Sequence, residues 1–270
     1  HDVEESSISV KLGASEYQSN LFCLFNNNFI GNRAGLGNTT GNNNNFIGLY
    51  AGKCNTGGNH GVFLGSYAGC FNTTGSSNVF MGDGAGNKNT TGSYNTMIGE
   101  CAGACSNVTG CSNNFIGRCA GKCASDTGRD NNFFGINTGY CNTTGSYNNF
   151  IGQNAGKYNT IGSTNIYVGL SAGLCGTEAS RNVFIGQYAG IGNTTGCCNN
   201  MIGRGAGQCA TVTGLHNNFL GTLAGKCASG SGQYNTFIGY YAGCLNTSGS
   251  NNNFIGRSAG SNNTTGGLNN

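Results

Sequence analysis

Hydrophobic and polar positions follow one short pattern that recurs fourteen times along the chain. Each copy has a polar residue, usually Asn, before a large apolar pair such as Phe-Ile, then Gly, two variable positions, Ala-Gly, and a polar stretch that often reads Asn-Thr-Thr-Gly. The glycine after the apolar pair recurs every 17 or 18 residues, at Gly31, Gly48, Gly65, Gly82, Gly99, Gly117, Gly135, Gly152, Gly169, Gly186, Gly203, Gly221, Gly239 and Gly256. A period this short and strict is typical of one small unit stacked on itself.

The apolar pair and the glycines predict the shape of each unit. No stretch repeats apolar residues at the i, i+3, i+4 spacing of a helix, and the Gly-bearing segments are suited to corners between two or three strands of about four residues. A unit of 17 residues cannot bury its own apolar face, whereas a stack of identical units can. We therefore predict an all-β protein, a parallel β-solenoid of about 14 rungs, with 17–18 residues per rung and about 4.8 Å between rungs.

Each rung carries two adjacent apolar positions. The first is Phe, Tyr or Met, as at Phe29 and Phe46, and the second is typified by Ile30 and Ile47. Because neighbouring residues of a strand point to opposite faces, one column faces outward unless the chain turns between the two positions and buries both. An outward apolar ladder would be a poor surface for a monomer.

Asparagine forms a column four residues before the first glycine of each rung. Asn tolerates left-handed turn geometry, and stacked amides can bond one another along a solenoid. We predict a structural Asn ladder, broken by Gly61, with ligand binding as the alternative role. Its members are Asn27, Asn44, Asn78, Asn95, Asn113, Asn131, Asn148, Asn165, Asn182, Asn199, Asn217, Asn235 and Asn252.

The chain divides into a non-repeat leader, residues 1–25, and a β-solenoid repeat domain, residues 26–270. In the leader, Ile8, Val10 and Leu12 alternate with polar residues, which is a strand signature, and its net charge is −3 against +6 for the repeats. We expect the leader to cap the solenoid or to dock against another copy, with Ile8, Val10, Leu12 and Cys23 as candidate inter-subunit residues. The repeats end without a capping sequence, which indicates head-to-tail assembly or a piece of a longer protein.

Fifteen cysteines offer a second set of candidates. Seven share one column, at Cys54, Cys105, Cys123, Cys141, Cys175, Cys209 and Cys227. Cα atoms in adjacent rungs would be about 4.8 Å apart, within the range of a disulfide. The candidate disulfides are Cys105–Cys123, Cys101–Cys119 and Cys209–Cys227, which would indicate an oxidising, extracellular setting. The alternative is that free Cys fills corners of the core.

Composition narrows the classes of function. Only 8% of residues are charged and the net charge is +3, so we expect no nucleic-acid partner. No apolar run reaches the ~20 residues of a membrane span. The acidic residues form no clear pair, no Ser/His/Asp set can be assembled, and the Cys spacing lacks CxxC pairs. We therefore expect no enzyme activity, no catalytic or metal-binding residues and no cofactor. The chain begins with His1, which suggests a removed signal peptide or a trimmed record.

The Asn-Thr-Thr triplets match the acceptor pattern for N-glycosylation. The candidate acceptors are Asn38, Asn72, Asn89, Asn107, Asn142, Asn193, Asn246 and Asn263. The alternative is that Asn-Thr-Thr-Gly is turn chemistry. A stacked Thr array also raises ice binding as a distant alternative function.

The segments NNFIG, NVFIG and NTFIG, each followed by xxAG, resemble two known kinds of repeat. They are similar to the head repeats of trimeric autotransporter adhesins, and to the NTFIG-x-x-AG-x-x-NTTG repeats of phage tail-fibre-like and surface proteins, over residues 26–270. The resemblance implies a β-roll or β-solenoid but transfers no binding residue. We expect an extracellular or cell-surface structural protein that self-assembles into a filament. An adhesin or tail-fibre shaft that binds a cell surface or glycan, as a homotrimer in the adhesin case, is the alternative.

Overall fold

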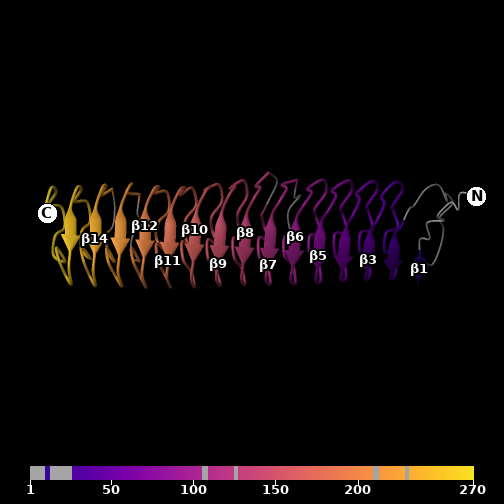
Figure 1. The fold of residues 1–270 in the computed structure, drawn as a ribbon, viewed down its shortest axis with the longest axis horizontal. Coiled ribbons are helices and arrows are strands. Elements are labelled where there is room, and N and C mark those ends of the chain that lie inside the picture. The colour runs from indigo at the N-terminus through magenta and orange to yellow at the C-terminus, as the bar shows by residue number, and fades with distance from the viewer. Residues whose placement is uncertain (1–9, 13–25, 105–108, 125–126, 209–212, 229–230) are drawn as a thin grey trace, which may run out of the picture. The chain divides into compact units, whose positions relative to one another are not determined.

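The computed structural model describes residues 10–12, 26–104, 109–124, 127–208, 213–228 and 231–270 (Figure 1). These residues contain fifteen strands of three residues each and no helix. The strands are β1 (Val10–Leu12), β2 (Asn28–Ile30), β3 (Asn45–Ile47), β4 (Val62–Leu64), β5 (Val79–Met81), β6 (Thr96–Ile98), β7 (Asn114–Ile116), β8 (Asn132–Phe134), β9 (Asn149–Ile151), β10 (Ile166–Val168), β11 (Val183–Ile185), β12 (Asn200–Ile202), β13 (Asn218–Leu220), β14 (Thr236–Ile238) and β15 (Asn253–Ile255). The candidate residues Ile8, Cys23, Cys105, Asn107 and Cys209 lie outside the described residues.

The chain forms two compact units, residues 1–129 and residues 130–270. In the first unit each strand from β1 to β7 pairs in parallel with the next, and in the second unit β8 to β15 do the same. The register is one rung per strand, so Phe29 lies level with Phe46 and Phe133 with Phe150. The predicted parallel β-solenoid is confirmed.

Each rung has one strand, so the expectation of two or three strands of about four residues was wrong. The rest of each rung consists of turns whose backbone groups still bond to the adjacent rung. Gly35 N–H donates to the Ala51 carbonyl at 2.9 Å and Thr39 N–H to the Thr56 carbonyl at 3.0 Å. The many left-handed residues bend these segments too sharply for strand geometry, yet stacking identical turns satisfies their backbone groups.

The core is a column of stacked aromatic rings, interrupted once in each unit by a methionine, Met97 or Met201. The central residue of every strand from β2 to β15 points inward and is at most 9% exposed. Ring centroids of Phe46 and Phe63 are 4.5 Å apart, and those of Phe150 and Tyr167 are 4.7 Å apart with ring planes 3° from parallel. The rings therefore stack at about the rung spacing, and the small buried alanines such as Ala51 fill the space beside them.

Two glycines per rung are required by close approach. Gly186 has φ +133°, a conformation open essentially only to glycine, and a Cβ there would lie 2.5 Å from the carbonyl oxygen of Gly203 in the next rung. Gly190 has φ +57°, and a Cβ there would lie 2.5 Å from the ring of Phe184. The backbone of the next rung and the core ring occupy the space that a side chain would need.

The first and third residues of each strand from β2 to β15 point away from the core, and we call these side chains the outward face of each unit. Phe150 is fully buried, whereas the next residue, Ile151, is 47% exposed. The turn between the two apolar positions that would bury both is therefore absent. Of the two arrangements open to the sequence, the one with an outward apolar column is observed.

Strand β1 confirms the strand expected in the leader. Val10 pairs level with Asn28 and Leu12 with Ile30, within the same chain. In the sequence, Leu12 is followed by Gly13 just as Ile30 is followed by Gly31. The leader segment therefore occupies the position of a preceding rung's strand.

Candidate functional site

The predicted Asn ladder is present and buried. All thirteen of its members are at most 2% exposed. Asn165 shows the pattern of bonds along and across the solenoid: its Nδ2 donates to the Ala179 carbonyl at 2.7 Å, and its Oδ1 accepts from Asn182 N–H at 3.0 Å. At the break in the column, Gly61 N–H still donates to Asn44 Oδ1 at 2.8 Å. These amides satisfy backbone groups that no water reaches, which is a structural role.

A second buried ladder runs through the asparagines of the Asn-Thr-Thr triplets. Asn72 Nδ2 donates to Asn55 Oδ1 at 2.8 Å, and Asn89 Nδ2 donates to Asn72 Oδ1 at 2.7 Å. In the second unit, Asn159 Nδ2 donates to Asn142 Oδ1 at 2.7 Å. The sequence reasoning missed this ladder, although the recurrence of Asn seven residues after the first glycine was a signal for it.

This second ladder argues against the glycosylation hypothesis. A glycan attaches to Nδ2, and here that atom is enclosed and donates to a carbonyl three residues ahead. The candidate acceptors Asn38, Asn72, Asn89, Asn142, Asn193 and Asn246 are all at most 3% exposed. Asn263 is partly exposed, but its Nδ2 also donates, to Asn246 Oδ1 at 2.7 Å. The turn-chemistry interpretation of Asn-Thr-Thr-Gly accounts for the folded structure.

In a rung that carries an Asn of both ladders, the two side chains donate to the same carbonyl. Asn148 Nδ2 and Asn159 Nδ2 donate to the Gly162 carbonyl at 2.8 and 2.9 Å. Asn235 Nδ2 and Asn246 Nδ2 donate to the Gly249 carbonyl, each at 2.8 Å. A carbonyl oxygen has two lone pairs and accepts both bonds. This junction ties opposite walls of the rung together across its interior.

The threonines beside the second ladder also bond along the solenoid. Thr56 Oγ1 donates to the Thr73 carbonyl at 3.1 Å, and Thr73 Oγ1 to the Thr90 carbonyl at 3.0 Å. The second threonine of the triplet, as at Thr74, is exposed. The hydroxyls of Thr39, Thr73 and Thr143, each the first threonine of a triplet, are therefore engaged with backbone and are not free outward donors.

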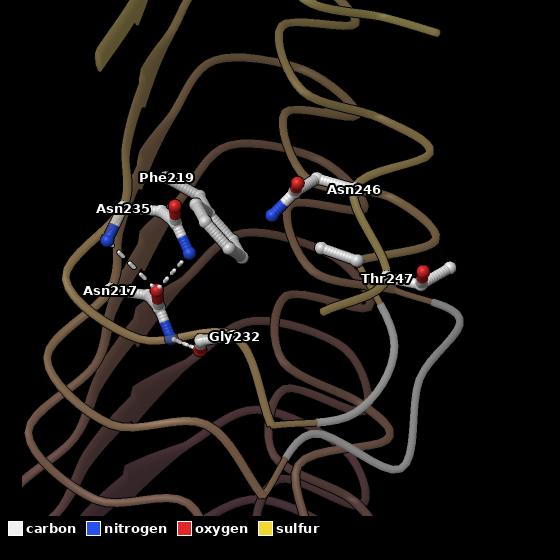
Figure 2. Close-up of a pocket in the computed structure, with 7 residues that line it drawn as sticks. Asn217, Phe219, Gly232, Asn235, Asn246 and Thr247 are labelled. Atoms are coloured by element: carbon white, nitrogen blue, oxygen red, sulfur yellow. Dashed lines mark hydrogen bonds between the residues drawn. The ribbon is translucent and has the colours of Figure 1, made fainter. Parts of the chain in front are cut away.

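A small cavity interrupts the second ladder where a long rung has Ala228 in place of Asn (Figure 2). Its volume is about 10 Å³, and its lining includes Phe219, Asn235 and Asn246. Figure 2 shows Asn217 bonded to Asn235 and to the Gly232 carbonyl beside the cavity. This space suits a single water molecule and no larger ligand.

The described cysteines do not form the predicted disulfide. Cys101 and Cys119, in the same column of adjacent rungs, are both unbridged thiols. In-register side chains leave the backbone in parallel, so their Cβ atoms stay about 4.8 Å apart, whereas a disulfide needs about 3.8 Å. Cys123 is also a thiol; its proposed partner Cys105 lies outside the described residues, as does Cys209, the proposed partner of Cys227.

Cysteine chemistry is further restrained by burial. Cys70 is 3% exposed. Burial, with the adjacent Cys54 thiol as a smaller contribution, raises the pKa of Cys70 from 9.0 to about 11. Burial also raises the pKa values of Cys101, Cys175, Cys197 and Cys244. Since the thiolate is the reactive form, these thiols are less nucleophilic than an ordinary cysteine.

The last described rung presents an unmatched stacking surface. At the other first glycines of the second unit, as at Gly186 and Gly239, a Cβ would meet the carbonyl of the next rung, whereas no atom lies within 4 Å of a Cβ on Gly256. No described strand pairs with the far edge of β15. Ile255 is 71% exposed. This surface has the shape that the other rungs of the second unit offer to their successors.

Two other kinds of feature are absent from the described residues. No group of three or more His, Cys, Asp or Glu side chains is placed to hold a metal ion. In the same part of the chain, no helix long and apolar enough to cross a membrane is found.

Comparison of the chain with known protein families, curated proteins and solved structures finds no significant match.

Proposed function

We propose that this protein is a structural subunit that stacks head to tail into an extracellular fibre, without enzymatic activity or cofactor. The observation that carries the proposal is the repeated rung-to-rung interface. Backbone bonds of one pattern, the column of core side chains and the first Asn ladder join successive rungs within a unit. An interface made of identical rungs can also form between the last rung of one copy and the start of another.

Two features of the chain supply the ends of this contact. The rung of β15 offers unpaired strand edges, an exposed Ile255 and open space above Gly256. At the other end, β1 occupies one edge of β2, so an incoming β15 would pair with the outer edge of β1 and continue the parallel sheet. The leader carries −3 and the repeats +6, and this opposite charge favours approach of the two ends.

A shaft that binds a cell surface or glycan is the second candidate. The rings of Tyr50 and Tyr67 lie 5.0 Å apart on adjacent rungs. The Lys53 ammonium and the Arg33 guanidinium lie 5.1 and 5.7 Å from the Tyr50 ring. Clustered Tyr and Arg side chains are typical of contact surfaces. This candidate, like the extracellular location, also draws on the resemblance to adhesin and tail-fibre repeats.

Blocking the last rung tests head-to-tail stacking. In Gly256→Ala, the added methyl would occupy the space that an incoming carbonyl needs, while nothing within the chain contacts it. Negative-stain electron microscopy of the wild-type chain should show long fibres of even width, and Gly256→Ala should give short particles. Ser258→Ala, a change at an exposed residue of the same rung, should still give fibres. Discrete short rods from the wild-type protein, or long fibres from Gly256→Ala, would contradict the proposal.

A further inference from the structure

The outward face of the sheet carries apolar side chains with nothing packed over them. In β8–β15, Ile151 and Leu220 are each 47% exposed and Ile185 is 39% exposed. Parallel sheets are normally covered on both faces. The core covers the inward face of this sheet, and no described segment covers the other. We propose that the outward face is a lateral docking surface for a second copy of this chain.

The outward face has no charged residue. Every first and third position of β8–β15 is Ile, Val, Leu, Phe, Asn or Thr, and β2–β7 add only Met to that set. Charged residues of the same rungs lie at the turns, as at Lys157, Arg204 and Arg257. Exposed β surfaces usually carry charges, which keep them from associating. Their absence from every strand of this face favours association.

The repeat spacing indicates which partner fits. The rings of Tyr167 and Phe184 are 4.8 Å apart, and those of Phe219 and Phe237 are also 4.8 Å apart, which gives the spacing of the columns. A partner that interdigitates with such a ladder over many rungs needs side chains at the same spacing. A second copy has that spacing by construction of its sequence, and two identical faces can meet in a closed, two-fold symmetric contact.

The available area suits such a contact. A three-residue strand is about 10 Å long and rungs are about 4.8 Å apart. The eight strands β8–β15 thus offer roughly 380 Å², and the six strands β2–β7 roughly 290 Å². Contact between two copies through the face of β8–β15 alone buries about twice 380 Å², roughly 760 Å², which lies in the range of weak, transient interfaces below about 1,200 Å².

Two lysines on the outward face provide the test. The double variant Ile151→Lys/Ile185→Lys places two charges on this face without touching the core. The matched control is Ile161→Lys: Ile161 lies in the rung of Ile151 and is 50% exposed, but it belongs to the Asn-Thr-Ile turn. Each variant is made in the Gly256→Ala background of the full chain, so that end-to-end stacking does not contribute to the mass. Circular dichroism and the thermal midpoint check that each variant folds.

Sedimentation equilibrium should give a dimer for Gly256→Ala and for Gly256→Ala/Ile161→Lys. The two-lysine variant should dissociate, with a Kd at least about tenfold higher. A monomeric Gly256→Ala chain, a trimer, a dimer unaffected by the two lysines, or equal disruption by Ile161→Lys would overturn the proposal. Fibre length tests the head-to-tail stacking, and mass per unit length tests the lateral docking. Without Gly256→Ala, the two-lysine variant should still form fibres, with half the mass per unit length of wild-type fibres. If the chain forms the lateral dimer but no fibres, only the head-to-tail stacking is contradicted, and the lateral docking surface is still supported.

Discussion

The hydroxyl of Tyr167 faces Gly176, 3.5 Å from the point where a Cβ atom on that glycine would stand. In the adjacent rungs, Asn159 and Asn193 occupy the position of Gly176. The one rung with Tyr in place of a core Phe or Met is thus a rung that lacks its second-ladder Asn. No hydrogen bond of standard geometry reaches the buried Tyr167 hydroxyl or Asn159 Oδ1. Burial raises the pKa of Tyr167, and the nearby Asn182 side chain lowers it by a smaller amount.

Substituting both residues, Tyr167→Phe and Gly176→Asn, should restore the second ladder in this rung. Tyr167→Phe removes a buried hydroxyl that no hydrogen bond of standard geometry reaches, so we expect a change in unfolding free energy between zero and a gain of about 1 kcal/mol. Gly176→Asn alone should cost about 1–3 kcal/mol, because its amide meets the tyrosine hydroxyl. In the double variant, Asn at position 176 can donate to Asn159 Oδ1. Urea unfolding of the four proteins gives the coupling energy.

We expect a coupling energy of about 1 kcal/mol or more between the two substitutions, favouring the double variant. Additive effects of the two substitutions would show that Tyr167 and Gly176 are independent and that the ladder is not rebuilt.

Breaking the first ladder should destabilise the fold strongly. Asn165→Ala leaves the Asn182 N–H and the Ala179 carbonyl buried without their partner. Leaving buried polar groups unsatisfied costs about 1–3 kcal/mol each, so we expect a loss of about 2–5 kcal/mol in unfolding free energy. The control Asn218→Ala removes an exposed amide from the outward face and should change stability by less than about 0.5 kcal/mol. Equal losses from the two variants in chemical denaturation would contradict a structural role for the ladder.

Alanine at the first glycine of a rung should destabilise the fold because its methyl group meets the backbone of the next rung. Gly186 and Gly256 have φ +133° and +127°, so alanine pays a similar backbone cost of about 1–3 kcal/mol at either position. Only at Gly186 would the methyl also meet the backbone of the next rung, at 2.5 Å. Gly186→Ala should therefore lower the thermal midpoint well below that of Gly256→Ala. Similar midpoints, measured at concentrations where the chain does not assemble, would mean that the rungs can separate to admit a methyl group.

The thiol of Cys70 should make the fold sensitive to alkaline pH. Its pKa is raised from 9.0 to about 11 in the folded state, so the folded state holds the proton more tightly than the unfolded state. The resulting contribution to stability is complete below pH 9 and is lost as the pH rises towards 11. The thermal midpoint should fall over this range in the wild type and fall less in Cys70→Ala.

The partly exposed Cys123 serves as the reference thiol. Alkylation followed by mass spectrometry should label Cys70 more slowly than Cys123 near pH 8. Equally fast labelling would mean that the Cys70 thiol is accessible.

The period, the parallel stacking and the first Asn ladder were predictable because each follows from like residues at equal spacing. Phe150, Asn148 and Gly152 recur at one offset from rung to rung, and in-register stacking must bring each level with its counterparts. The second ladder was missed because Asn142 and its equivalents belong to a triplet that also reads as a glycosylation acceptor. The prediction of a disulfide between Cys101 and Cys119 was wrong. The expected Cα spacing allowed this bond, but the parallel direction of the side chains does not.

By itself, the sequence determined that identical units stack and which positions form columns, because a strict period leaves no other way to bury units of 17 or 18 residues. Only the tertiary structure decided whether each column of side chains faces the core or faces outward. The direction of a side chain depends on where the chain turns, and the left-handed residues that set those turns include Tyr50, Cys101 and Arg181 as well as glycine. For this reason the Asn-Thr-Thr amides face inward and the Ile151 column faces outward.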